Sequence, residues 1–182
     1  MIEVEIKAKV DDFNDIKQRL KEKGATFIKT SNQTDRLFFI SKFLDSENKI
    51  VEGGIVARIR EDDRKVLELK EISRAKGGVE IKFDISNVDT IKGFLNKLGF
   101  QEGFTMKKNR EYFEYKNFEI CLDLVEQLGN FIEVERLVTS KSEKDKAKEE
   151  CLNLLKQLAP DSKIENRKYG DIIQDMKKNS NQ

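Results

Sequence analysis

The first strand-like segment of the chain carries two carboxylates and a lysine at alternate positions. Met1-Ile-Glu3-Val-Glu5-Ile-Lys7 alternates apolar and charged residues. Successive side chains of a strand point to opposite faces, so Glu3, Glu5 and Lys7 share one face. Carboxylates at this spacing can bind a hard divalent cation through oxygen, and a lysine beside them can bind phosphate. The alternative is an amphipathic strand with a solvated face, which the segment alone does not exclude.

Paired charges recur on single faces of three further strand-like segments. The pairs are Arg58 with Arg60, Glu68 with Lys70, and Glu133 with Glu135, while Asp123 alternates with two leucines. Close like charges on a strand face are destabilising unless a group of opposite sign lies between them. A polyphosphate with a divalent metal supplies both signs, because Arg and Lys bind phosphate oxygens while carboxylates bind Mg²⁺ or Mn²⁺. The pattern therefore indicates a site for a metal-bound polyphosphate.

The composition excludes several other kinds of chemistry. The chain has 182 residues and no histidine, which rules out a Ser-His-Asp triad, a histidine–zinc site and imidazole acid–base catalysis. A net charge of +1 argues against a nucleic-acid partner. Cys121 and Cys151 are expected as packed thiols, although the sequence leaves a disulfide open. We expect a cytoplasmic protein with no membrane partner, because no apolar run reaches membrane length and the charged N-terminus is unlike a signal peptide.

A mainly antiparallel sheet is needed to position these residues. Alternation and turn residues predict eight strands, at 2–10, 35–41, 54–61, 65–72, 79–85, 110–115, 117–125 and 130–138. Most of them are joined by short links, which favours antiparallel pairing. Helices are predicted at 11–23, 87–98, 141–158 and 171–178, and the first two end at Gly24 and Gly99. The predicted fold class is therefore α+β.

A weak internal repeat relates the two halves of the chain. Leu20-Lys-Glu-Lys-Gly24 followed by Asp35-Arg36-Leu-Phe-Phe39 resembles Leu95-Asn-Lys-Leu-Gly99 followed by Asn109-Arg110-Glu-Tyr-Phe113. We therefore expect pseudo-symmetric halves, each with a strand, a helix, a glycine stop and an aromatic strand. No linker or low-complexity segment separates them, so residues 1–178 are predicted to form one domain and residues 179–182 a disordered tail.

Six elements in this order resemble the CYTH superfamily, the triphosphate tunnel enzymes that include class IV adenylyl cyclases and thiamine triphosphatases. They are Glu3-x-Glu5-x-Lys7, Arg58-Ile-Arg60, Leu69-Lys70, Asp123, Leu128-Gly129-Asn-Phe131-Ile-Glu133-Val-Glu135 and Arg167-Lys-Tyr169-Gly-Asp-Ile-Ile173. The first motif alone is weak, but the ordered set covers nearly the whole chain. The resemblance is closest to the class IV adenylyl cyclases, whose C-terminal Ser-Tyr motif is matched here except that Lys168 stands in place of the serine.

The resemblance implies an eight-stranded antiparallel closed barrel with flanking helices, whose charged strand faces line a tunnel that binds a triphosphate. It implies catalytic roles for Glu3, Glu5 and Lys7, and Mg²⁺ or Mn²⁺ bound by Glu3, Glu5, Asp123, Glu133 and Glu135. The implied phosphate-binding residues are Lys7, Arg58, Arg60, Lys70, Lys76 and Arg110, with Glu68, Glu80 and Tyr169 as further candidates. One departure is Gly78, where many relatives have an arginine. Either a phosphate contact is lost here, or Arg74 or Lys76 of the preceding loop replaces it.

Three functions fit these residues, all with a small-molecule triphosphate as the partner. The first is a class IV adenylyl cyclase, which converts ATP to cyclic AMP and pyrophosphate. The second is a triphosphatase that hydrolyses thiamine triphosphate, tripolyphosphate or a nucleoside triphosphate. The third is a non-catalytic binder of such a compound. The phosphate-binding residues do not discriminate cyclisation from hydrolysis. The oligomeric state is left open, with a homodimer as one alternative.

Overall fold

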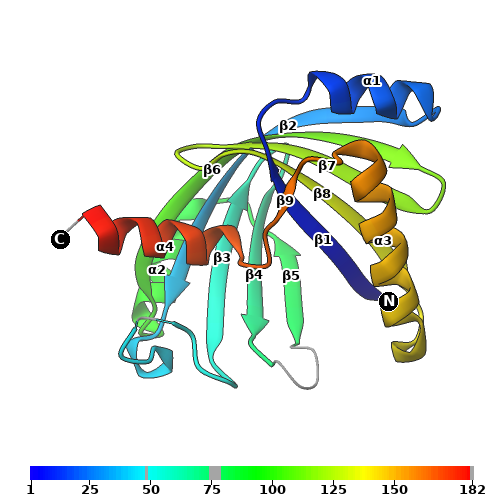
Figure 1. Cartoon of the computed structure of the whole chain (residues 1–182). Helices are drawn as coiled ribbons and strands as arrows, with labels where there is room; N and C mark the ends of the chain where they lie inside the picture. Colours follow the sequence, from blue (N-terminus) through cyan, green and yellow to red (C-terminus); the bar gives the residue numbers. More distant parts are fainter. Residues whose placement is uncertain (48, 74–78, 181–182) are drawn as a thin grey trace. The chain divides into compact units, whose positions relative to one another are not determined.

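The computed structural model describes residues 1–47, 49–73 and 79–180 (Figure 1). Its strands are β1 (Ile2–Val10), β2 (Thr26–Phe39), β3 (Ile55–Glu61), β4 (Lys65–Glu71), β5 (Glu80–Asp84), β6 (Gln101–Tyr115), β7 (Phe118–Val125), β8 (Gly129–Val138) and β9 (Lys163–Ile164). Its helices are α1 (Asn14–Glu22), α2 (Val88–Lys97), α3 (Lys144–Leu158) and α4 (Tyr169–Ser180), with short 3₁₀ helices η1 (Ser41–Phe43) and η2 (Lys141–Glu143). The predicted α+β class is confirmed.

The strands are hydrogen-bonded in the order β5-β4-β3-β2-β6-β7-β8-β1-β9. The pairs β1–β8, β1–β9, β2–β3, β3–β4, β4–β5, β6–β7 and β7–β8 are antiparallel, which agrees with the predicted mainly antiparallel sheet. The strand count is nine and not eight, because the two-residue strand β9 is added beside β1, and two residues carry no alternation by which to predict it. In the described part of the chain, β5 and β9 are the two edge strands of the sheet, and they do not pair with each other. The predicted closed barrel is therefore not confirmed.

The chain forms two compact units. The first unit holds residues 1–31 and 108–182, and the second holds residues 32–107. Both boundaries fall inside the two longest strands, β2 and β6, so no linker composition marks them. The single domain over residues 1–178 therefore stays a prediction. Helix α4 continues to Ser180, two residues into the predicted tail, and residues 181–182 lie outside the described residues.

The core of the first unit lies between one face of its strands and helices α1 and α3. Ile6, Ile120, Leu122, Ile132 and Val134 point from the strands into this core, which Leu155, Leu158 and other residues of α3 complete. Figure 1 shows α3 packed along β1 and β8. Because side chains alternate along each strand, burying these apolar residues turns the intervening charged residues to the other face.

The core of the second unit is built in the same way. Phe38, Ala57, Ile59 and Leu67 are almost fully buried on one face of β2, β3 and β4, and Leu95 of α2 packs with them. Arg58 and Arg60 alternate with these apolar residues along β3, so they lie on the face of the strands opposite this core. Each unit therefore has one apolar face that packs on a helix and one face rich in charged side chains.

Two strands are much longer than predicted. Strand β2 begins at Thr26 and not at residue 35, and β6 begins at Gln101 and not at residue 110. The first five residues of β2 are exposed, as are four of the first five of β6. Strands that are solvated on both faces show little hydrophobic alternation, which is the signal on which the prediction depended.

The helix ends agree better with the prediction, because their signals are local. Gly24 and Gly99 follow α1 and α2 with φ of 77° and 87°, in the left-handed region that favours glycine. Helix α3 follows a capping box in which Ser140 and Glu143 exchange hydrogen bonds. No helix in the described residues is long and apolar enough to cross a membrane.

Candidate functional site

Acidic residues of β1 and β8 lie together on the charged face of the first unit. The antiparallel register sets Glu5 directly opposite Glu135 and Lys7 directly opposite Glu133. Glu3 lies two residues from Glu5 on the same face. Glu3 and Glu5 are exposed, whereas Lys7 and Glu133 are each 8% exposed. The pairing thus brings together the catalytic and metal-binding candidates of two segments that are far apart in the sequence.

The acidic row continues across the neighbouring strand. Glu119 of β7 lies directly opposite Glu135. Partial desolvation, followed by the charge of Glu133, raises the pKa of Glu5 to about 7. Desolvation, followed by the charges of Glu3, Glu119 and Glu5, raises the pKa of Glu135 to about 7. Desolvation and the charges of the neighbouring carboxylates together outweigh the effect of the nearby bases, so this face would be stabilised by an added cation.

The chemistry of this face fits a divalent cation, although its side chains are not arranged as ligands. Carboxylate oxygens are the ligands that Mg²⁺ and Mn²⁺ prefer. Within the described residues, however, no group of three or more acidic, histidine or cysteine side chains is placed to hold a metal ion. Side-chain rotation on β1 and β8 would therefore have to accompany metal binding.

Asp123 and Arg110 form a buried ion pair. Asp123 is fully buried on β7, and Arg110 lies directly opposite it on β6. Arg110 donates from Nε to Oδ1 of Asp123 at 2.5 Å, and Nη2 is ion-paired with both Asp123 and Glu133. Lys108 Nζ donates to Oδ2 of Asp123 at 3.0 Å. Burial by itself would raise the pKa of Asp123, but hydrogen bonding from Arg110 and the charge of Lys108 outweigh it and lower the pKa.

Tyr169 connects helix α4 to this cluster. Its hydroxyl donates to Oδ2 of Asp123 at 3.0 Å, and its ring lies edge-on to Phe131 at 5.0 Å between centroids. Lys7 Nζ lies 4.2 Å from the centre of the ring, and Lys108 Nζ lies 5.3 Å from it. Burial, followed by the charges of Glu133 and Asp123, raises the pKa of Tyr169, so its hydroxyl remains a donor. The first residue of α4 therefore helps to fix both lysines and the buried aspartate.

The second unit carries a cluster centred on the two arginines of β3. Asp35 of β2 lies directly opposite Arg60 and is 1% exposed. Arg60 donates to both carboxylate oxygens of Asp35, from Nε at 2.7 Å and from Nη2 at 2.6 Å. Arg58 Nη1 lies 3.4 Å from Oδ2 of Asp35, while its Nη2 is ion-paired with Glu68. Both arginines keep an exposed part, 27% for Arg58 and 22% for Arg60.

The remaining charged residues of the second unit lie on β4 and β5. Lys70 Nζ is 3.3 Å from a carboxylate oxygen of Glu80, and Lys82 is ion-paired with Glu80 and lies 3.7 Å from Glu68. Desolvation opposes ionisation of Glu80, but the hydrogen bond from Lys82 and the charge of Lys70 outweigh it and lower its pKa. Lys76 and the departure at Gly78 lie outside the described residues.

A family model for the CYTH domain matches residues 1–169. The chain belongs to the CYTH family. A Methanocaldococcus jannaschii protein named "putative adenylate cyclase" is 34% identical over 164 residues, which are 87% of this chain and 90% of that protein. The PH1819 protein of Pyrococcus horikoshii has a TM-score of 0.77 at 26% identity, covering 96% of this chain and 99% of that one. A Hippeastrum "putative adenylyl cyclase" described with a dominant triphosphatase activity has a TM-score of 0.65 at 16% identity, covering 94% of each chain, which shows similarity of fold.

The predicted CYTH site residues are divided between the two units. The first unit contains Glu3, Glu5, Lys7, Arg110, Asp123, Glu133, Glu135 and Tyr169, and the second contains Arg58, Arg60, Glu68, Lys70 and Glu80. Sequence reasoning missed Asp35, Lys108 and Glu119, which lie on the same charged faces. The alternation rule could have found two of them, because Lys108 precedes Arg110 by two residues and Glu119 precedes Asp123 by four.

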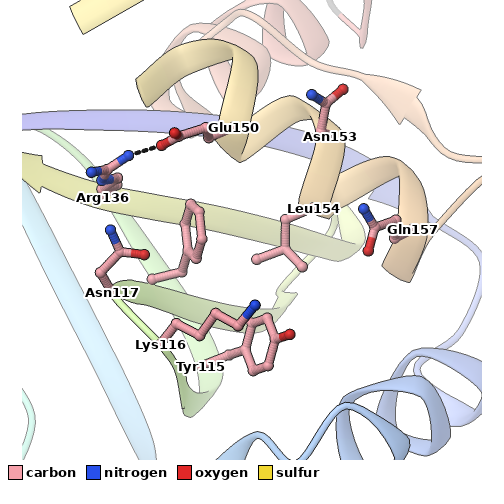
Figure 2. Close-up of a pocket in the computed structure, with 9 residues that line it drawn as sticks. Tyr115, Lys116, Asn117, Arg136, Glu150, Asn153, Leu154 and Gln157 are labelled. Atoms are coloured by element: carbon pink, nitrogen blue, oxygen red, sulfur yellow. Dashed lines mark ion pairs between the residues drawn. The ribbon is translucent and has the colours of Figure 1, made fainter. Parts of the chain in front are cut away.

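A separate surface cleft in the first unit is not part of this CYTH site. Its volume is about 320 Å³, and it lies between the β6–β7 turn and α3 (Figure 2). Its lining residues are Tyr115, Lys116, Asn117, Phe118, Arg136, Glu150, Asn153, Leu154 and Gln157. Arg136 is ion-paired with Glu150 across the cleft, as the dashed line in Figure 2 marks. None of these lining residues is a predicted site residue.

Proposed function

We propose that the chain is a metal-dependent enzyme that acts on a triphosphate and converts ATP to cyclic AMP and pyrophosphate. The observation that carries this proposal is the charged face of each unit, opposite its apolar core. In the first unit it holds mainly carboxylates on β1 and β8 with Lys7 among them, and in the second it holds Arg58, Arg60 and Lys70 with Glu68 on β3 and β4. Each set of charges suits one part of the substrate, because carboxylates bind a divalent cation while guanidinium and ammonium groups bind phosphate oxygens. The M. jannaschii relative, named for the cyclase reaction, supports the choice of ATP.

The residues would divide the work according to their charge. Glu3, Glu5 and Glu135 would hold the cation, together with Glu133 once it turns from Arg110. Asp123, also predicted as a metal ligand, would instead keep its two hydrogen bonds from Arg110. When bound, a divalent cation acts as a Lewis acid that lowers the pKa of a coordinated hydroxyl and offsets charge on the phosphate. Arg58, Arg60 and Lys70 would bind the oxygens of the pyrophosphate that leaves, because guanidinium and ammonium groups bind phosphate strongly.

Lys7 and Arg110 would stabilise charge that develops on the phosphate during reaction. Both lie beside the carboxylates in the first unit, and Arg110 is held in place by Asp123. Fixed donors need little reorganisation as the reaction proceeds, which is the usual source of large rate effects from such groups. In this reaction the ribose 3′-oxygen loses its proton to water and forms a bond to the α-phosphorus. The bond from that phosphorus to the bridging oxygen breaks, and pyrophosphate leaves with the electron pair.

Hydrolysis of a triphosphate is the second candidate. Every group assigned above binds cation or phosphate, and a water could take the place of the 3′-hydroxyl without any further residue. The Hippeastrum protein, which shares the fold, is described with triphosphatase activity. The two reactions differ in which phosphorus lies in line with the nucleophile, so products decide between them.

A product assay tests the proposal. The purified chain is incubated with ATP, thiamine triphosphate or tripolyphosphate, each with Mg²⁺ or Mn²⁺, and the products are separated by chromatography. Cyclic AMP with equimolar pyrophosphate supports the cyclase, and orthophosphate alone overturns it in favour of hydrolysis. Binding of a triphosphate without any product would indicate that the chain is a non-catalytic binder.

Matched variants test whether the assigned residues carry any activity that is found. Glu5→Gln and Lys7→Ala should each lower kcat by about 100-fold or more, the size expected for groups that stabilise transition-state charge. Glu149→Gln removes an exposed carboxylate on α3 and should keep the wild-type rate. Full activity in both site variants would contradict the assignment.

A further inference from the structure

We propose that Asp35 is a positioning residue, which holds the guanidinium groups of Arg58 and Arg60 ready for an oxyanion. The proposal rests on the phosphate-binding function of the two arginines. Asp35 itself is not expected to touch the ligand, because its side chain is only 1% exposed. Its role would be exerted through the arginines.

The contacts of Asp35 fix Arg60 at two points. Nε and Nη2 of Arg60 donate to the two carboxylate oxygens at 2.7 and 2.6 Å, so the planar guanidinium and carboxylate lie as a bidentate pair. A single contact would leave the long side chain free to rotate about it. Two contacts define the direction of the guanidinium plane, which matters for an anion that is itself bound bidentately.

Arg58 is held by the same carboxylate and by a second one. Its Nη1 lies 3.4 Å from Oδ2 of Asp35, and its Nη2 is ion-paired with Glu68 on β4. Arg58 and Arg60 share a face of β3, so their charges repel each other unless a negative group lies between them. Asp35 contacts both arginines from the neighbouring strand, so it offsets this repulsion and keeps them side by side.

The same kind of pair occurs in the first unit. Asp123 is fully buried, lies directly opposite Arg110 on the neighbouring strand, and accepts hydrogen bonds on both oxygens from Arg110. Asp35 stands in the same relation to Arg60. A buried aspartate that orients an arginine of the adjacent strand is therefore used once in each unit.

Positioning and bulk charge predict opposite results when Asp35 is replaced. Asp35→Asn keeps the shape of the side chain but removes one negative charge beside two arginines. If Asp35 acted only through its charge, this change would strengthen the binding of a polyanion by Coulomb attraction. If Asp35 positions the arginines, binding weakens, because the amide offers one acceptor oxygen where the carboxylate offered two.

Calorimetric titration with inorganic tripolyphosphate, without metal, measures whether Asp35→Asn weakens or strengthens binding. We expect Asp35→Asn to raise the dissociation constant at least tenfold relative to the wild type. Glu61→Gln is the matched control, because it removes a carboxylate that is ion-paired with Arg36 across the same two strands but on the other face. It should change the constant less than twofold. Unchanged or tighter binding of tripolyphosphate by Asp35→Asn overturns the positioning role. In that case, binding of tripolyphosphate by the wild type would still support the proposed function.

A second variant decides the matter if Asp35→Asn does not fold. Asp35→Glu retains the charge and displaces it by one methylene, so any loss of affinity reports on position alone. We expect a three- to tenfold weaker affinity, and wild-type affinity would overturn the proposal. In turnover, both variants should raise KM while kcat falls less than twofold, because ground-state and transition-state phosphates are bound alike. A wild-type chain that binds no tripolyphosphate would overturn both this proposal and the phosphate-binding function.

Discussion

Glu5 on β1 lies directly opposite Glu135 on β8, and both carboxyls have a pKa raised to about 7. Like charges in directly opposite positions of an antiparallel pair are destabilising. Strain of this kind persists at functional sites, where a ligand removes it and the rest of the fold compensates for it. The pair therefore gives the first unit a property that can be measured without knowing the substrate.

Glu5→Gln should stabilise the metal-free protein at alkaline pH. The pKa of Glu5 lies at about 7 in the folded chain against its usual 4.5. A carboxyl with a raised pKa contributes stability below about pH 4.5 and loses that contribution as the pH rises through about 7. Glutamine does not ionise, so the variant does not lose stability as the pH rises. It should melt at a higher temperature than the wild type at pH 8 and at the same temperature near pH 4.5. Differential scanning calorimetry in EDTA measures the difference.

The exposed control Glu149→Gln should follow the wild type at every pH in the same scans. Parallel curves for the wild type and Glu5→Gln from pH 4.5 to 8 would show that the pKa of Glu5 is not raised in the folded chain.

Divalent cations should stabilise the wild type through the same carboxylates. A ligand that binds only the folded state adds about 2.7 kcal/mol at a hundred times its dissociation constant. Rising Mg²⁺ or Mn²⁺ at pH 8 should therefore raise the melting temperature, and the double variant Glu5→Gln with Glu135→Gln should lose most of this rise. Sodium chloride at matched ionic strength controls for screening. An equal rise in the double variant would place the cation elsewhere.

The sequence predicted the composition of each charged face better than the contacts on it. Alternation along one strand put Arg58 beside Arg60 and Glu3 beside Glu5 on one face without knowledge of pairing. It could not show that Asp35 lies opposite Arg60, because register depends on turns and on strands far apart in the sequence. The local rule therefore predicted which residues share a face but not which residues touch.

The elements of the fold that carry a local sequence signal were predicted well, and those without one were not. Strands β3, β4, β7 and β8 were predicted within about two residues, because each is half buried and alternates strongly. The first five residues of β2 and the first three of β6 are all exposed and lack that pattern, and closure of the sheet is not encoded in any single strand. The helix stops at Gly24 and Gly99 were predicted correctly, since left-handed backbone favours glycine whatever the tertiary context.

Tyr169→Phe should weaken the attachment of α4 to the buried aspartate. The change removes the hydroxyl that donates to Asp123 and keeps the ring that packs on Phe131. A hydrogen bond to a charged buried group contributes about 2 kcal/mol. We expect a loss of that size in urea unfolding, whereas Tyr115→Phe at the end of β6 should change the free energy of unfolding by less than about 0.5 kcal/mol. Equal values for the two variants would rule out the Asp123 contact as a stabilising one.

Two leucines on the same strand test whether the apolar face of the first unit supports its charged face. Leu122 is fully buried in the core with α3, whereas Leu124, two residues further along β7, is 52% exposed. Leu122→Ala should lower the free energy of unfolding by about 3 kcal/mol, the cost of a cavity in a packed core, and Leu124→Ala by less than about 0.5 kcal/mol. Chemical denaturation measures both. Asp123 lies between the two leucines and points to the opposite face. Leu122→Ala should therefore also reduce the rise in melting temperature caused by Mn²⁺. An unchanged rise would show that the two faces are independent.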